Sequence, residues 1–394
     1  MSKGDKYLSR AVLDLAPSGI RRFFDVASQM EGVISLGVGE PDFVTPWHIR
    51  EACFDSLERG YTMYSSNQGI IELREEIAKY MYRTQGLSYD PEEEVLITVG
   101  VSEATDLILR ALLMPGEEVM IPEPSYVSYV PCTIMAGGKP VILCTDAEHE
   151  FRLTAEELAG KITEKSKALI LSYPNNPTGA IMEREDLEAL VDIIIKHDLI
   201  VISDEIYGEL TYGGKKHVSI ATLPGMKERT IVLNGFSKAF AMTGWRIGYA
   251  CGDPDIIGAM NKIHQYTMLC APMMGQRAAL EALRHGESEM LRMVEDYDRR
   301  RRLVLKGFRE IGMPCFEPEG AFYVFPSIAR TGLSSVEFSE KLLREEKVAV
   351  VPGDAFGSCG EGFIRCCYAY SVEHIQQALD KINNFIDRNE KKTP

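Results

Sequence analysis

Residues 234–248 read NGFSKAFAMTGWRIG and join two apolar runs that have the composition of β-strands. Lys238 lies in this stretch among phenylalanine and alanine, an unusual neighbourhood for an ammonium group. Apolar surroundings lower the pKa of a lysine and leave more of the free amine, the form that attacks a carbonyl. An arbitrary lysine is more often a surface residue after a turn. Ser237 and Arg246 favour a reactive lysine, because a hydroxyl and a guanidinium suit a phosphate.

The same stretch contains the pattern Ser-Lys-x-Phe-x-Met-x-Gly-Trp-Arg at 237–246. In these residues the sequence resembles the class I/II aminotransferases, of the aspartate and aromatic aminotransferase type, among the fold-type I pyridoxal-phosphate enzymes. The resemblance runs from residues 35–43, SLGVGEPDF, to Phe363-Ile364-Arg365. It implies that pyridoxal 5'-phosphate forms a Schiff base with Lys238. It also implies that the amino group of an L-amino acid passes to a 2-oxo acid by a ping-pong mechanism.

Composition limits the partners of the chain. Its 394 residues are enough for two domains, and its 45% apolar and 26% charged residues are typical of globular proteins. A net charge of −15 argues against nucleic acid and anionic membranes as partners. The N-terminus leads to no apolar signal core and no run reaches the length of a membrane span, so a cytoplasmic location is expected.

The cysteines and histidines indicate neither a disulfide framework nor a metal site. Nine cysteines are scattered without a C-x-x-C pair, and most are expected to be reduced core residues. Seven histidines show no paired ligand spacing, so no metal is expected.

From Val95 onward, short β-rich runs alternate with helical stretches. Strands are expected at 95–98, 118–121, 140–143, 168–172, 200–203, 230–233 and 248–251, with helices such as 103–113, 154–161 and 184–197 between them. Several of these runs are apolar on both faces, as in parallel strands that helices cover on both sides. The sequence therefore predicts an α/β fold, with a three-layer αβα large domain and a mostly parallel sheet over 46–285.

The remaining residues, 1–45 and 286–394, are predicted to form a smaller α+β domain from both termini. Its N-terminal arm is expected to carry an amphipathic helix before Gly32, and a long helix is expected over 287–311. Arg299–Arg302 lie on that long helix. Four successive positions cannot share one helix face, so these arginines are expected to be solvated.

Candidate ligand-binding residues follow the predicted strands, at the ends where ligands gather in parallel sheets. Asp204 could pair with a pyridinium nitrogen and keep it protonated, or it could cap the next helix. Tyr207 could bond the ring oxygen from the following turn. Asn176 lies in a loop that two prolines and a glycine make rigid, and its bond to Pro177 is predicted to be cis.

A phosphate site is predicted at the start of the helix after Gly100. Its first residues, Val101, Ser102 and Glu103, would present free N–H groups and the positive end of the helix dipole to a phosphate. Junctions of this kind are common, so the prediction of a phosphate site here depends on Ser237 and Arg246 as well.

The resemblance implies further roles that the residues alone do not. Tyr126 would stack on the cofactor ring and Asn176 would contact the ring oxygen and the substrate carboxylate, while Gly39 and Arg365 would bind that carboxylate. Tyr64 would reach the phosphate of the neighbouring subunit, so a homodimer with composite active sites is expected. Without the resemblance, Tyr64 would be a packed loop residue and Arg365 a surface arginine.

Two other functions stay open. A C–S β-lyase on the same fold uses nearly the same residues, and a catalytically idle binding or regulatory protein could share the fold without the reaction. A dinucleotide-binding oxidoreductase is disfavoured, because no G-x-G-x-x-G follows a strand. The preferred substrate is not determined, since no arginine can be assigned to a second carboxylate.

Overall fold

The structure is a computed structural model that describes residues 6–13, 15 and 30–389. The helix predicted before Gly32 falls largely outside these residues. In the described part of the chain, no helix is both long and apolar enough to cross a membrane.

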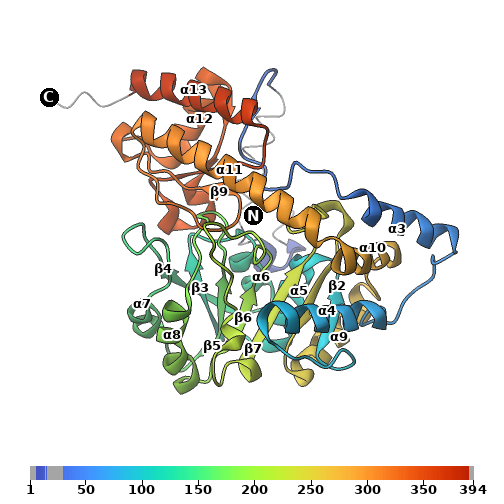
Figure 1. The fold of residues 1–394 in the computed structure, drawn as a ribbon. Helices are drawn as coiled ribbons and strands as arrows, with labels where there is room; N and C mark the ends of the chain where they lie inside the picture. The colour runs from blue at the N-terminus through green and yellow to red at the C-terminus, as the bar shows by residue number, and fades with distance from the viewer. Residues whose placement is uncertain (1–5, 14, 16–29, 390–394) are drawn as a thin grey trace.

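A seven-stranded sheet forms the centre of the fold (Figure 1). Its strands, in the spatial order β2-β8-β7-β6-β5-β3-β4, are β2 (Val95–Thr98), β8 (Gly248–Cys251), β7 (Thr230–Gly235), β6 (Ile200–Asp204), β5 (Ser166–Ser172), β3 (Glu118–Glu123) and β4 (Lys139–Cys144). Strands β3 to β7 pair in parallel, and β8 runs antiparallel to both β2 and β7. The mostly parallel sheet predicted from the apolar runs is confirmed.

Helices cover both faces of this sheet, because successive side chains of a strand point to opposite faces. In β5, Ala168 and Ile170 pack in one core cluster while Leu169 and Leu171 pack in another. The first face carries α5 (Gly100–Leu112), α6 (Tyr129–Met135) and α9 (Pro254–Thr267); the other carries α4 (Ile71–Gln85), α7 (Ala155–Lys161), α8 (Arg184–Lys196) and α10 (Met273–His285). The helix α3 (Trp47–Glu58) packs on α10. The three-layer αβα arrangement is therefore present.

The C-terminal elements gather beyond the sheet (Figure 1). They are the helices α11 (Glu287–Ile311), α12 (Ser335–Glu346) and α13 (Val372–Asn389) and a three-stranded antiparallel sheet of β11 (Val351–Pro352), β12 (Ile364–Cys367) and β9 (Tyr323–Val324). Their core also takes in Tyr207, Leu210 and Tyr212 from a loop of the large sheet. The strand β1 (Ile34–Ser35) pairs in parallel with β10 (Val348–Ala349). This pairing brings an N-terminal segment to the C-terminal unit.

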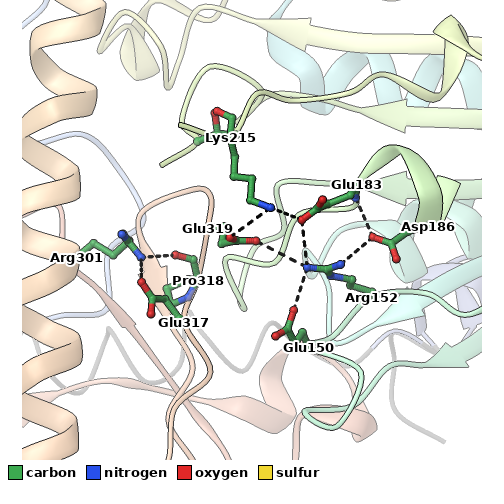
Figure 2. Close-up of polar contacts among 10 residues, drawn as sticks. Glu150, Arg152, Glu183, Asp186, Lys215, Arg301, Glu317, Pro318 and Glu319 are labelled. Carbon is green, nitrogen blue, oxygen red and sulfur yellow. Dashed lines mark hydrogen bonds and ion pairs between the residues drawn. The ribbon is translucent and has the colours of Figure 1, made fainter. Parts of the chain in front are cut away.

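The arginine run on α11 corrects one expectation. Arg300 and Arg301 are buried, at 7% and 5% exposure. Arg300 pairs with Asp42 and Asp296. Arg301 binds Glu317 and the carbonyl of Pro318 (Figure 2). Adjacent positions on a helix turn by about 100°, so two of four can face the packed side while the outer two stay solvated.

A charged network joins the segment before β9 to the loops of the large sheet. Glu319 lies between Lys215 and Arg152, and Arg152 also contacts Glu150 and Asp186 (Figure 2). The backbone N–H groups of residues 319 and 320 both donate to the Gly179 carbonyl. The segment is thereby held against the loop that carries Asn176.

The prediction of reduced cysteines is wrong for one pair. Cys144, at the end of β4, forms a disulfide with Cys359 in the 3-10 turn Ser358–Gly360, with Cα atoms 5.7 Å apart. The two residues are 215 positions apart, so no spacing pattern could reveal them. The other seven cysteines are free thiols, of which Cys251, Cys366 and Cys367 are buried.

Candidate active site

A cavity of about 600 Å³ lies where the carboxyl ends of the sheet strands meet the C-terminal unit. It is lined by eleven residues that the sequence singled out, namely Gly39, Val101, Ser102, Tyr126, Asn176, Asp204, Tyr207, Ser237, Lys238, Arg246 and Arg365. They come from segments spread over more than 300 positions. The parallel strands bring these residues together, because the carboxyl ends of the strands and the loops that follow lie along one edge of the sheet.

Lys238 projects from the turn after β7 into this cavity. Its Nζ donates to the Gly39 carbonyl at 2.7 Å and lies 5.7 and 5.6 Å from the ring centroids of Tyr207 and Phe322. Desolvation lowers the pKa of Lys238 to about 8. The expectation of a depressed lysine pKa is therefore confirmed, and a sizeable fraction of the amine is neutral near physiological pH.

Asp204 ends β6 with its carboxylate buried at the cavity wall. Oδ2 accepts a hydrogen bond from Tyr129 Oη at 2.7 Å, and Oδ1 accepts one from the Ile206 N–H at 3.2 Å. Desolvation raises the pKa of Asp204 to about 6, against the opposing effect of the Tyr129 hydrogen bond. The sequence also allowed Asp204 to cap a following helix, but residues 206–209 form a turn and no helix begins there. The bond to Ile206 closes this turn and leaves the carboxylate facing the cavity. Tyr129 was not found from sequence, because an aromatic in an apolar helix resembles any core residue.

Tyr207 follows Asp204 by one turn and faces the same cavity. Its Oη lies 2.6 Å from Tyr323 Oη, and both phenols are buried. Tyr323 opens β9, and nothing in the run around it distinguishes it from packing residues.

The N-terminus of α5 and the Arg246 side chain lie side by side. A Cβ at Gly100 would lie 2.5 Å from Arg246 Nη2, so the glycine leaves room for the guanidinium at the helix end. Val101 and Ser102 line the cavity there, but Glu103 does not. The Glu103 carboxylate accepts from the Val99 N–H at 2.5 Å and contacts the buried His264 Nδ1 at 2.7 Å. Its side chain holds the helix start in place.

Arg365 is buried in β12. Without the family resemblance it was expected to be a surface arginine, and that expectation is wrong. Its Nη1 donates to Asn176 Oδ1 at 2.8 Å and its Nη2 donates to the Gly37 carbonyl. The guanidinium also lies 4.5 Å from the ring centroid of Tyr323. In the Asn176 loop, the predicted cis bond before Pro177 is wrong; the cis peptide bonds of the described residues precede Pro124 and Pro174.

The two remaining tyrosines are placed differently. Tyr126 is half-buried at the cavity and packs edge-to-face on Tyr129, with centroids 5.6 Å apart. Tyr64 is 80% exposed and does not line the cavity of its own chain.

The lining residues fit pyridoxal phosphate. The aldehyde of this cofactor requires a free amine, its ring nitrogen a carboxylate, and its phosphate a cation and free N–H groups. Lys238, Asp204 and Arg246 at the start of α5 supply them around one cavity. This fold and this site together define a fold-type I pyridoxal-phosphate enzyme.

Comparison with known proteins gives the family. Residues 31–382 match the family described as aminotransferase class I and II. The chain is 53% identical to a putative aminotransferase of Bacillus subtilis (strain 168), over 97% of this chain and 99% of that protein. It is 50% identical to an aspartate aminotransferase of Pyrococcus abyssi, over 95% and 97% of the two chains.

A solved aromatic aminotransferase from Pyrococcus horikoshii superposes with a TM-score of 0.89 at 46% identity, covering 93% of this chain and 99% of that one. The chain therefore belongs to the class I and II aminotransferases. These are pyridoxal-phosphate-dependent enzymes that transfer an amino group from an amino acid to a 2-oxo acid.

Proposed function

We propose that Lys238 carries the cofactor and moves the proton in an amino-group transfer from an L-amino acid to a 2-oxo acid. The observation that supports this most strongly is that the Lys238 amine, the Asp204 carboxylate and the Arg365 guanidinium face one cavity. When bound, pyridoxal phosphate supplies an electron-withdrawing ring that acidifies the Cα–H bond of the amino acid. Lys238, with a pKa of about 8, is suited to accept and return that proton near neutral pH.

The other cavity residues have assigned roles in this proposal. Asp204 keeps the ring nitrogen protonated, and Tyr207 and Asn176 donate hydrogen bonds to the ring oxygen. Ser102, Ser237, Arg246 and the backbone N–H groups of residues 101–103 hold the phosphate, and Tyr126 stacks on the ring.

Arg365 and Gly39 set the reaction type in the same proposal. The buried guanidinium can pair with the α-carboxylate of the substrate. Arg365 and the Gly39 N–H would fix the carboxylate in one orientation, so that the bound cofactor would weaken the Cα–H bond and not the bond to the carboxylate. The proton is then lost in preference to carbon dioxide.

We also propose a homodimer in which Tyr64 reaches the phosphate of the partner subunit. Supporting this, exposed apolar side chains gather on α3 and on the loop after it, namely Trp47, Phe54, Tyr61, Met63 and Tyr64. The Asn67 side chain ties this loop to the end of α9 through the Leu269 carbonyl at 2.6 Å, next to the exposed Tyr266. Apolar patches of this kind commonly mark contact surfaces.

Mixing two inactive variants tests the composite site. A dimer of one Lys238→Ala and one Tyr64→Ala subunit contains one site with both native residues, so mixing should restore activity above that of either variant alone. Tyr82→Ala is the control for the loss of an exposed tyrosine, because Tyr82 is exposed on α4, and this variant should be active without mixing. A mixture that stays as inactive as its parts contradicts the composite site.

Two predictions concern the chain as a whole. We propose 46–285 as the large domain and 1–45 with 286–394 as the small one, supported by the pairing of β1 with β10. The cytoplasmic location stays a prediction.

A panel of amino acids tests the reaction. Purified protein loaded with pyridoxal phosphate should lose its visible absorbance with an amino acid and regain it with a 2-oxo acid. Aspartate and the aromatic amino acids come first, because relatives carry those names. Release of pyruvate and ammonia would instead indicate a β-lyase. Borohydride treatment and peptide mapping should label Lys238, and an unlabelled Lys238 would overturn the proposal.

A further inference from the structure

Tyr207 and Tyr323 form a pair of phenols at the cavity wall. Their oxygens are 2.6 Å apart, and their rings meet edge-to-face with centroids 5.8 Å apart. Both line the cavity, and their exposures are 5% and 0%. A contact this short between two neutral hydroxyls is a hydrogen bond in which one phenol donates and the other accepts.

The direction of that bond follows from counting hydrogens. A phenol carries a single hydrogen and can donate one hydrogen bond. Under the proposed function, on which this step rests, Tyr207 donates to the ring oxygen of the cofactor. Its hydrogen is then not available for Tyr323. We propose that Tyr323 is a positioning residue, which donates to Tyr207 and so turns the Tyr207 hydrogen toward the cofactor.

The charges around the pair favour this direction. The permanently charged Arg365 guanidinium lies 4.5 Å from the centroid of the Tyr323 ring, whereas the Lys238 amine lies 5.7 Å from that of Tyr207. A nearby cation stabilises the electron-rich phenol oxygen that donation leaves behind, so Tyr323 is the better donor of the two. Tyr323 thereby links the proposed carboxylate anchor to the proposed ring-oxygen donor.

The residues around Tyr323 restrict its position. Tyr323 pairs with Cys367 across β9 and β12, and Gly39 lies against its hydroxyl. A Cβ at position 39 would lie 2.3 Å from the Tyr323 Oη. On the preceding segment, Glu319 is held between Arg152 and Lys215 (Figure 2). The phenol therefore has little freedom to turn away.

The test measures how the visible absorbance of the cofactor-loaded protein changes with pH. A hydrogen bond to the ring oxygen favours its ionised form, and a donor behind Tyr207 strengthens that bond by cooperative polarisation. Tyr323→Phe should raise the midpoint of the absorbance titration by about 0.3 pH unit. Tyr207→Phe should raise it further. The double variant should match Tyr207→Phe alone, because Tyr323 acts through Tyr207.

A matched control separates this role from packing. Tyr368 is a fully buried phenol of the same core that donates to the Ala321 carbonyl at 3.1 Å and does not line the cavity. Tyr368→Phe should lower thermal stability about as much as Tyr323→Phe does, and it should leave the midpoint of the absorbance titration unchanged. Gly39→Ala gives a second approach, since its methyl group must displace the Tyr323 hydroxyl, and it should raise the midpoint as Tyr323→Phe does.

Three results would overturn the role of Tyr323. A downward shift in Tyr323→Phe means that Tyr207 donates to Tyr323, and an unchanged midpoint means that Tyr323 has no influence. Additive shifts in the double variant mean that it does not act through Tyr207. In each case a normal visible band on the wild-type protein keeps the proposed function intact. A wild-type protein that never forms the band overturns both.

Discussion

Replacing Asp204 with asparagine should stabilise the cofactor-free protein and weaken its hold on the cofactor. Asparagine has the same shape and carries no charge. It can also keep the existing contacts, because Oδ1 can accept from the Ile206 N–H as before. Nδ2 can donate to the Tyr129 oxygen, whose hydrogen then turns to Ser172 Oγ, 2.8 Å away. The substitution therefore removes a buried charge and leaves no polar group unpaired.

The magnitude follows from the raised pKa of Asp204. Burial raises this pKa from 3.8 to about 6, which corresponds to about 3 kcal/mol of folding free energy. The sign follows from proton binding: between these values the folded state holds a proton that the unfolded state has lost. The protonated Asp204 carboxyl therefore contributes its full amount to folding stability below pH 3.8, and this contribution is lost as the pH rises through about 6. Asp204→Asn should not lose folding stability in this pH range, because asparagine carries no charge.

Thermal denaturation of cofactor-free protein at pH 5 and pH 8 measures the effect. For a chain of this length, about 3 kcal/mol raises Tm by about 3 °C, so Asp204→Asn should gain that much at pH 8 and about half as much at pH 5. Cofactor affinity should fall by about 100-fold, the equivalent of losing one buried ion pair. Asp192→Asn is the control, because Asp192 is exposed on α8 and should change neither quantity. An unchanged or lower Tm at pH 8 would refute the buried-charge argument.

Three further predictions concern other residues. The rate at which cofactor-free protein takes up pyridoxal phosphate, followed by visible absorbance, should rise with pH and level off above about 8, the pKa of Lys238; a midpoint near 10 would contradict its desolvation. Arg365→Lys should lower kcat/KM by about 30-fold, or about 2 kcal/mol, through the loss of a bidentate pair, and should leave cofactor affinity unchanged; steady-state kinetics and an absorbance titration check both. Arg152→Ala should cost about 1 kcal/mol, less in 1 M NaCl, because it removes the cation that pairs with Glu150 and Asp186 and leaves Glu319 with Lys215 alone. Arg302→Ala, at a 64% exposed side chain, should cost less than about 0.5 kcal/mol in the same melting experiment, and equal losses would contradict the network.

Most of the secondary structure could be read from local patterns. The strands β2 and β8 and the helix α11 occupy the predicted residues, and the other sheet strands differ by one or two positions at their ends. Apolar periodicity and turn residues act over a few neighbouring positions, which is why a single sequence contains them. Lys238 and Asp204 could be found in the same way, because each follows an apolar strand at the end where ligands gather.

What the tertiary structure alone decided is which distant side chains meet. The partners Tyr129 for Asp204, Tyr323 for Tyr207 and Cys359 for Cys144 come from segments 75, 116 and 215 positions away. The burial of Arg300 depends likewise on Asp42, across the C-terminal unit. Such contacts arise from the packing of whole elements. A phenol, a thiol or a guanidinium has the same local sequence signal whether its partner is water or a residue two hundred positions away.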